Sequence, residues 1–257
     1  MFNPVRRNRN IGTAKQGKGA DNLFDIPGSW HNALSFFEKL DSPLELKLHG
    51  WTILVESTRE QSFHACTVED ILQVLSWLPP ADLKGLNLIV LRQPKRKEEL
   101  LNPVWGRLIY SFEYQKPQPA IILESVDLTK RFSKIKKMGP DAMLEFERLK
   151  EDGHRFEETN KLFVADFHLE FVRNTQLYRT LPHEVGHFVH YNMYIEANKE
   201  DDYFALPKQE LEKFAHQYAQ KWRKQWQDQA LIPFPRKLDP AFMQQHALNW
   251  ADFQPGE

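Results

Sequence analysis

The stretch His183-Glu184-Val185-Gly186-His187 places two imidazoles and one carboxylate within five residues. In an α-helix, residues four apart share one face and lie about 6 Å apart along the axis. We therefore expect His183 and His187 to reach a single metal ion from one helix. Flanking apolar residues predict that this helix is packed on one side; they are Leu181, Val185, Phe188 and Val189.

The chemistry of these three side chains indicates a zinc site. Zinc accepts imidazole nitrogen at about 2.0–2.1 Å and keeps an open position for water in catalytic sites. Glu184 directly follows the first histidine, so its carboxylate is expected to approach the water without binding the metal. From there it would accept a proton as the water attacks a carbonyl and pass it to the leaving amine.

A third protein ligand is needed, and His190 does not fit that role. Along a helix axis, His183 and His190 lie about 10 Å apart, which is too far for all three rings to meet one ion. A second helix, predicted over residues 207–226, offers Glu210 and Glu212 on opposite sides of its apolar face. Periodicity leaves both glutamates open as the third ligand. No residue is assigned as the donor that would stabilise a transition state.

At these residues the sequence resembles the gluzincin metallopeptidases, in which a glutamate on a later helix completes the HExxH zinc site. Within that group it is similar to the family that cleaves phage-type repressors, over about residues 175–222. That family pairs HExxH with a helix reading Glu-Ala-Asn-x-Phe-Ala. Glu210 takes the ligand position, Phe214 and Ala215 match, and Leu211 and Glu212 depart from the Ala-Asn pair.

The resemblance implies Zn²⁺ bound by His183, His187 and Glu210, with Glu184 as the catalytic residue. It implies a zincin-like fold, in which a small twisted mixed sheet packs against the HExxH helix. One sheet edge would bind substrate backbone by strand addition, and the candidate edges are residues 120–126 and 163–171. The implied function is hydrolysis of peptide bonds in a protein or peptide. The alternative is a proteolytically inactive zincin-fold protein that binds a partner or regulates it.

Hydrophobic periodicity along the rest of the chain predicts an α+β fold, with a mixed sheet followed by helices. A turn at His49-Gly50 is expected to join the first two strands, and Thr67 is expected to cap a helix. The predicted strands span residues 44–49, 51–55, 86–91, 106–114, 120–126 and 163–171. The predicted helices include residues 67–78, 140–152, the HEVGH segment and 207–226.

Composition predicts a disordered basic arm over residues 1–22 and one domain over residues 23–257. Residues 23–172 would supply most of the sheet, and residues 173–257 the metal-binding helices. The net charge of −1 does not call for nucleic acid as a partner. A single cysteine excludes a disulfide within the chain, and no apolar stretch is long enough to span a bilayer. We therefore expect a cytoplasmic protein without a membrane partner.

Overall fold

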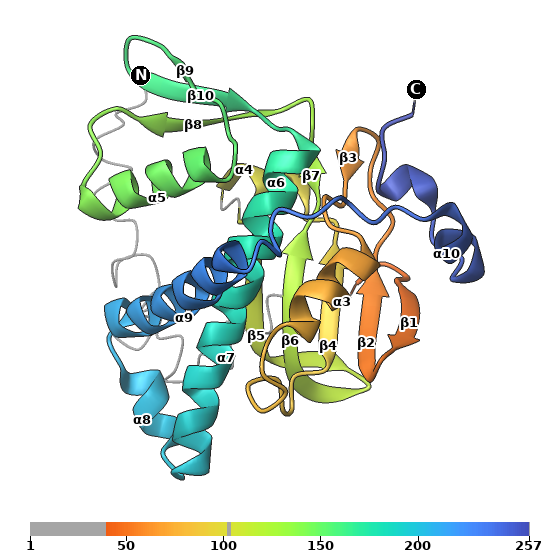
Figure 1. Cartoon of the computed structure of the whole chain (residues 1–257), viewed down its shortest axis with the longest axis vertical. Coiled ribbons are helices and arrows are strands. Elements are labelled where there is room, and N and C mark those ends of the chain that lie inside the picture. Colours follow the sequence, from red (N-terminus) through yellow and green to blue (C-terminus); the bar gives the residue numbers. More distant parts are fainter. Residues whose placement is uncertain (1–39, 102–103, 257) are drawn as a thin grey trace, which may run out of the picture.

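The computed structural model describes residues 40–101 and 104–256. The expected basic arm, residues 1–22, lies outside the described residues. Over the described ranges, a five-stranded mixed sheet, a smaller sheet and several helices form an α+β fold, as the sequence predicts. Figure 1 shows the larger sheet beside the crossed helices α7 and α9.

The larger sheet combines parallel and antiparallel pairing. Its strands, in spatial order, are β1 (Leu44–Leu48), β2 (Trp51–Val55), β4 (Leu88–Arg92), β6 (Lys116–Glu124) and β5 (Gly106–Tyr114). The two outer pairs are antiparallel, and the two inner pairs are parallel. All five residues of β4 are buried, as expected for a parallel strand covered on both faces.

The turn between β1 and β2 lies at His49-Gly50, as predicted. The two residues have φ of 51° and 83°. Two consecutive positive φ values give a turn whose twist matches that of paired strands, and glycine adopts such values without steric cost.

The two faces of the larger sheet have different coverings. The face that includes Ile53, Ile89 and Ile121 belongs to the main hydrophobic core. The opposite face, with Leu54 and Val90, belongs to a smaller cluster. The helices that contribute buried residues to the main core include α3 (Val68–Ser76), α7 (Leu181–Glu196) and α9 (Lys208–Asp228).

Helix α3 begins at the predicted cap. The Thr67 side chain accepts a hydrogen bond from the backbone N–H of Asp70, and the Asp70 carboxylate accepts one from the N–H of Thr67. This reciprocal pair satisfies two N–H groups that have no partner inside the helix.

The predicted strand over residues 163–171 is wrong in its second half. Strand β10 (Leu162–Asp166) ends at Asp166, and helix α6 (Leu169–Thr175) follows. Leu169 and Val172 are three residues apart and pack into one cluster with Val126, which is the spacing of a helix face. The free energy gained by burying that face outweighs the preference for a strand that the two-residue alternation of apolar side chains indicates.

A π-helical segment, Gln176–Thr180, joins α6 to α7. Pro182 lies in the first turn of α7 and has no N–H to donate to the Tyr178 carbonyl. Just before the HEVGH segment, the backbone hydrogen bonds therefore join residues five apart instead of four apart. The helix then continues into His183.

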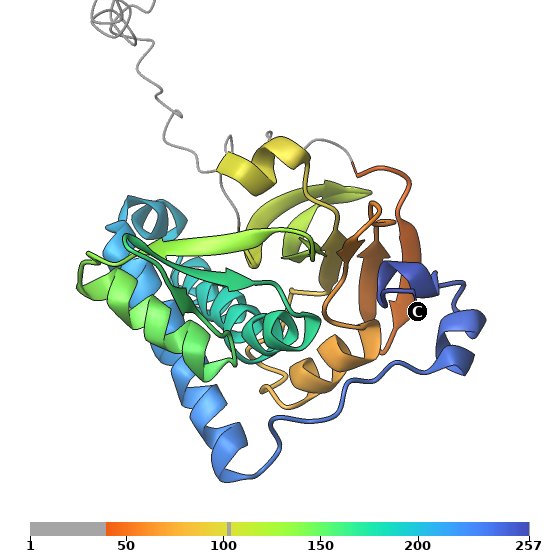
Figure 2. The same ribbon diagram turned by 90° about the horizontal axis from the view of Figure 1, so that it is seen from above.

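The smaller sheet forms a second layer with helix α5. Its strands are β8 (Arg131–Ile135), β10 and β9 (Glu157–Glu158), all antiparallel. Phe146 of α5 (Pro140–Glu151) stacks on Phe163 of β10, with ring centroids 4.6 Å apart. Figure 2 shows α5 between this sheet and α9. An ion pair of 3.0 Å joins Arg223 of α9 to Asp152, the residue that ends α5.

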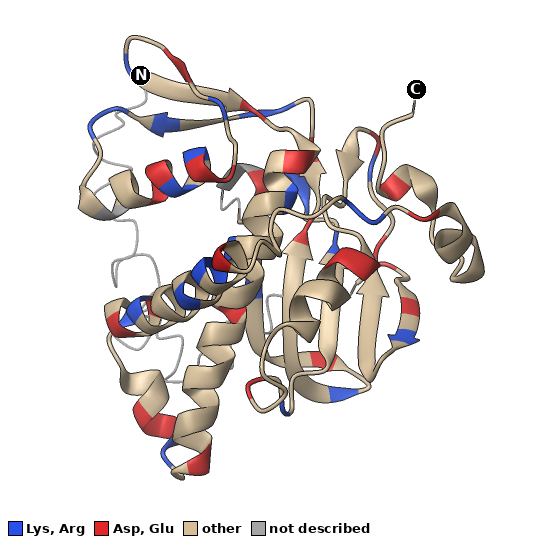
Figure 3. Ribbon diagram, in the orientation of Figure 1, with Lys and Arg blue, Asp and Glu red and all other residues tan. Residues whose placement is uncertain are grey.

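The remaining elements are short. They are β3 (Ser62–Phe63), β7 (Val126–Asp127), α4 (Arg96–Leu101), α8 (Glu200–Ala205) and α10 (Pro240–Gln245). Acidic and basic residues are interspersed along α5 and α9 (Figure 3). Every helix within residues 40–101 and 104–256 is too short or too polar to cross a membrane.

Candidate metal centre

Helices α7 and α9 approach each other closely at Gly186. A Cβ atom on Gly186 would lie 3.0 Å from the Cα of Ala215 and 3.0 Å from the Cβ of Tyr218. The absence of a side chain at Gly186 and the small one at Ala215 therefore allow the two backbones to come together. This contact brings the histidine face of α7 to α9.

Each helix presents two donor side chains four residues apart at this crossing. Helix α7 contributes His183 and His187, and α9 contributes Glu212 and His216. We call these four residues the donor cluster. The i, i+4 spacing places both members of each pair on the face that meets the other helix.

Three donor atoms of this cluster are arranged around one point. The Nε2 atoms of His183 and His187 are 3.1 Å apart. The Glu212 Oε2 atom lies 3.4 Å from Nε2 of His183 and 4.0 Å from Nε2 of His187. A tetrahedral zinc with ligands at about 2.0–2.2 Å holds neighbouring donors about 3.4 Å apart. The residues present therefore fit a zinc ion in both chemistry and spacing.

The structure brings Glu212, and not Glu210, to the two histidines. Glu210 is exposed in the first turn of α9 and is not among the described residues whose donor atoms lie together. Glu212, two residues later, faces α7. Of the two glutamates that periodicity left open, geometry therefore supports Glu212, whereas the family resemblance pointed to Glu210.

His216 is a member that the sequence reasoning did not assign. Donor atoms of His183, Glu212 and His216 all lie within 4.8 Å of one another. The rings of His183 and His216 have centroids 4.5 Å apart. The signal was present in the sequence, because Glu212-Lys-Phe-Ala-His216 has the same four-residue spacing as the HEVGH pair.

The four members of the donor cluster differ in their protonation. The hydrogen bond from His183 lowers the pKa of Glu212 to about 2. Burial acts against a charged His183, but the Glu212 carboxylate outweighs it and raises the pKa of His183. Burial, together with the positive His183, lowers the pKa of His187 and of His216 to about 4. The carboxylate form of Glu212 and the neutral imidazoles of His187 and His216 are the states that bind a metal, and His183 would have to give up its proton to do so.

The Glu184 side chain reaches the larger sheet. Its Oε2 atom accepts a hydrogen bond of 2.8 Å from the backbone N–H of Leu108 in β5. The side chain is buried, and burial raises its pKa, although His183 and the Leu108 N–H oppose that shift. A carboxylate of raised pKa is a better proton acceptor than an exposed one.

The two predicted edge strands are not edges. Strand β6, which contains most of residues 120–126, lies between β4 and β5, and β10 lies between β8 and β9. The edge of the larger sheet next to α7 is β5. The sequence predicted β5 as a strand but could not place it at the edge, because strand order depends on long-range pairing.

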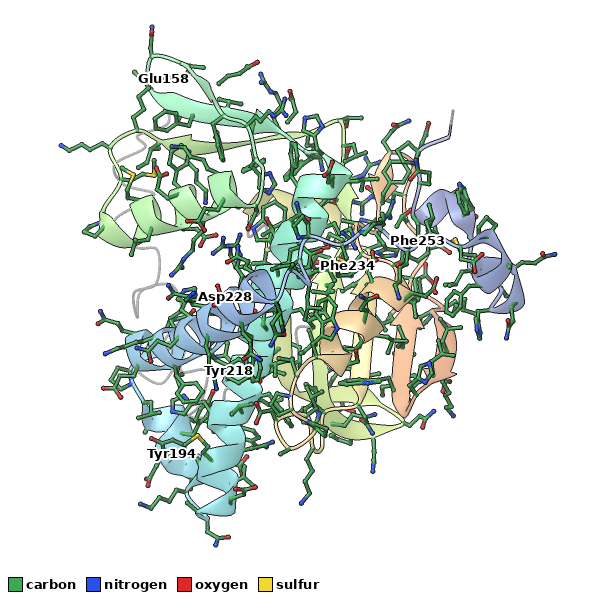
Figure 4. All side chains as sticks on the ribbon, viewed as in Figure 1. Glu158, Tyr194, Tyr218, Asp228, Phe234 and Phe253 are labelled. Atoms are coloured by element: carbon green, nitrogen blue, oxygen red, sulfur yellow. The ribbon has the colours of Figure 1, made fainter. Side chains whose placement is uncertain are left out.

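The other polar residues near the motif have separate partners. The hydroxyl of Tyr191 donates to Glu200, and that of Tyr218 donates to Asp82 at 2.7 Å. Tyr218, labelled in Figure 4, therefore joins α9 to the loop after α3. His190 stacks on Phe214 with ring centroids 4.2 Å apart, outside the donor cluster as described.

The buried Tyr203, paired with the half-buried Tyr110, contacts the backbone of α7 next to the cluster. The Tyr203 hydroxyl donates to the His187 carbonyl at 3.3 Å and lies 2.6 Å from the Tyr110 hydroxyl. Tyr110 belongs to β5 and Tyr203 to α8. These contacts fix the position of the second HEVGH histidine relative to the sheet edge.

Comparison of the chain with protein-family models, with curated proteins and with solved structures found no match.

Proposed function

We propose that this chain is a zinc-dependent metallopeptidase with a zincin-like arrangement of its sheet and HEVGH helix. His183, His187 and Glu212 would hold the zinc. One observation carries the proposal: three donors from two helices lie 3.1–4.0 Å apart, and Glu184, whose side chain is buried, directly follows the first of them on α7. Zinc bound there would polarise a substrate carbonyl and lower the pKa of water to about 7.

Glu184 would act as the general base and then as the acid. Its carboxylate accepts a proton from the attacking water as the new C–O bond forms. It then gives that proton to the amine nitrogen as the C–N bond breaks. The Leu108 N–H holds one carboxylate oxygen in place, so the other oxygen is the one that exchanges the proton.

Strand β5 is the element that supports a peptide as the substrate. An extended peptide would add to its outer edge through backbone hydrogen bonds. A cavity of about 550 Å³ is lined by Arg107, which precedes Leu108 in β5, and by apolar residues that include Trp105, Phe132 and Phe167; neither Glu184 nor a member of the donor cluster is among its lining residues.

One observation favours the alternative, a zincin-fold binding protein without proteolysis. Glu184 is only 9% exposed, and one of its oxygens is already bonded to Leu108. Substrate binding would have to admit water to this carboxylate for hydrolysis to occur.

The Glu184→Gln variant separates the two functions. Glutamine keeps the shape of the side chain and an oxygen that accepts from Leu108. We expect the variant to retain zinc and to lose at least about 100-fold in hydrolysis, because a general base contributes that much or more. The assay is mass spectrometry of a proteome-derived peptide library incubated with the full-length chain. Equal cleavage by wild type and variant, or none by either, would contradict a peptidase role.

A further inference from the structure

We propose that His216 is a fourth protein donor to the zinc, so that the resting centre is closed by three imidazoles and one carboxylate. This inference rests on the proposed zinc site, since it concerns the same ion. It goes beyond the HExxH-plus-glutamate set by adding a ligand from the second helix.

The position of His216 follows from that of Glu212. His216 lies one helical turn after Glu212 on α9, and Glu212 Oε2 is 3.4 Å from His183 Nε2. The His183 and His216 rings are 4.5 Å apart at their centroids. His216 therefore approaches the cluster from the same side as Glu212.

The distances are within reach of a shared ion. Donor atoms of His183, Glu212 and His216 lie within 4.8 Å of one another; His187 is not in this group of described residues, and its Nε2 atom lies 3.1 Å from that of His183. Two donors on opposite sides of one zinc are at most about 4.2 Å apart, and neighbouring donors about 3.4 Å. The donor atoms would therefore have to approach one another by at most about 1.4 Å to share an ion as neighbours.

The His216 ring packs against the His183 ring and Arg148. Its nearest described polar partner is Arg148, whose Nη1 atom is 3.4 Å from both ring nitrogens. A separation of 3.4 Å is at the long end of hydrogen bonding, and its equality shows that neither nitrogen is held preferentially. Either nitrogen can therefore face the ion.

A fourth protein donor changes what the centre does at rest. Structural zinc sites have four protein ligands, whereas catalytic sites keep one position open for water or substrate. With His216 bound, a substrate carbonyl must displace it or enlarge the coordination. His216 would thus act as a cap on the centre, and Arg148 lies beside the ring once it is released.

The direct test is zinc-edge X-ray absorption on the full-length, zinc-loaded protein, which counts imidazole ligands. We expect three imidazoles in the wild type, two in His216→Gln, and three in the control His168→Gln, whose side chain is exposed before α6. Two imidazoles in the wild type, unchanged in His216→Gln, would overturn the inference and leave the proposed zinc site intact. Absence of bound zinc in the wild type would overturn both.

A binding measurement distinguishes a cap from a residue that only stabilises a transition state. Acetohydroxamate, a small metal-binding probe, needs an open position on the zinc. We expect His216→Gln to bind it about tenfold more tightly than the wild type, equivalent to about 1.4 kcal/mol. Equal or weaker binding by a His216→Gln protein with wild-type circular dichroism would overturn the cap.

Discussion

Gly186 of α7 lies against Ala215 of α9, so closely that a Cβ atom added to Gly186 would be only 3.0 Å from the Cα of Ala215. That contact sets the distance between the two helices, and therefore the distance between His183 and Glu212. The metal centre thus depends on a backbone approach that a single methyl group would obstruct.

We predict that Gly186→Ala destabilises the protein by about 1–3 kcal/mol through overpacking. Alanine favours a helix interior over glycine by about 1 kcal/mol. A net loss of stability would therefore mean that the packing cost exceeds this gain. Urea unfolding measures the free energy, and chelator competition measures the accompanying loss of zinc affinity. A variant that is more stable than wild type and binds zinc equally well would contradict the close approach.

Glu212 and Glu210 form a matched pair for the third ligand. We predict that Glu212→Gln lowers zinc affinity by at least about tenfold. Substitution of a residue that only supports a metal ligand already costs about tenfold or more in affinity, and loss of a charged ligand costs more than that. Glu210→Gln should bind zinc as the wild type does, since Glu210 is exposed and outside the cluster. Competition with a chromophoric chelator gives both affinities. The reverse order would restore the assignment that the family resemblance implied.

The buried pair Asp70–Arg173 joins α3 to α6. Arg173 Nε and Nη2 donate to the two Asp70 oxygens at 2.7 and 2.8 Å, and the Asp70 side chain is fully buried. We predict that Asp70→Asn costs about 3–5 kcal/mol of unfolding free energy, because it leaves the Arg173 charge buried without its partner. Equilibrium denaturation measures this loss.

The control for that prediction is Asp228→Asn. Asp228 pairs with Lys224 at 2.8 Å, but both side chains are more than half exposed. Exposed pairs of this kind contribute at most about 1 kcal/mol. A similar cost for the two variants would show that burial is not what makes the Asp70 pair important.

The burial of His64, which lies outside the donor cluster, leads us to predict that the protein loses stability in acid. Its Nε2 atom lies 2.7 Å from the Glu56 carbonyl, and burial lowers its pKa to about 4. The folded state therefore keeps His64 neutral, while the unfolded chain takes up a proton below about pH 6.5. Stability must fall as pH drops from 6.5 toward 4, by about 2 kcal/mol between pH 7.5 and 5.

The variant His64→Gln isolates this contribution, because glutamine can donate to the Glu56 carbonyl but does not titrate. Its stability loss between pH 7.5 and 5 should be smaller than that of wild type by about 2 kcal/mol. Other groups, such as Glu124 with its pKa raised to about 7 by burial, act equally on both proteins and cancel in the difference. An equal loss in both proteins would place the titrating group elsewhere.

The features predicted correctly from the sequence are those encoded locally. The His49-Gly50 turn and the Thr67 cap depend on residues within one turn of the chain, and the structure contains both. The facing of His183 and His187 follows from helix geometry alone. Each needed only the period of an element and its end signals.

The features that the sequence could not provide depend on contacts between distant segments. Choosing Glu212 over Glu210 requires the rotation of α9, which the Gly186–Ala215 contact sets across the helix crossing. The edge position of β5 depends on its pairing with β6 and on no pattern within β5 itself. The spacing of Glu212 and His216 is visible in the sequence, but which face of α9 meets His183 follows only from the packing of α9 on α7.

The central claim is a zinc ion held between α7 and α9, and anomalous diffraction at the zinc edge from crystals of the full-length chain tests it most directly. We predict one peak within about 2.0–2.2 Å of the His183 and His187 Nε2 atoms and a Glu212 carboxylate oxygen. A peak at another position, or no peak from protein purified without chelators, would contradict it.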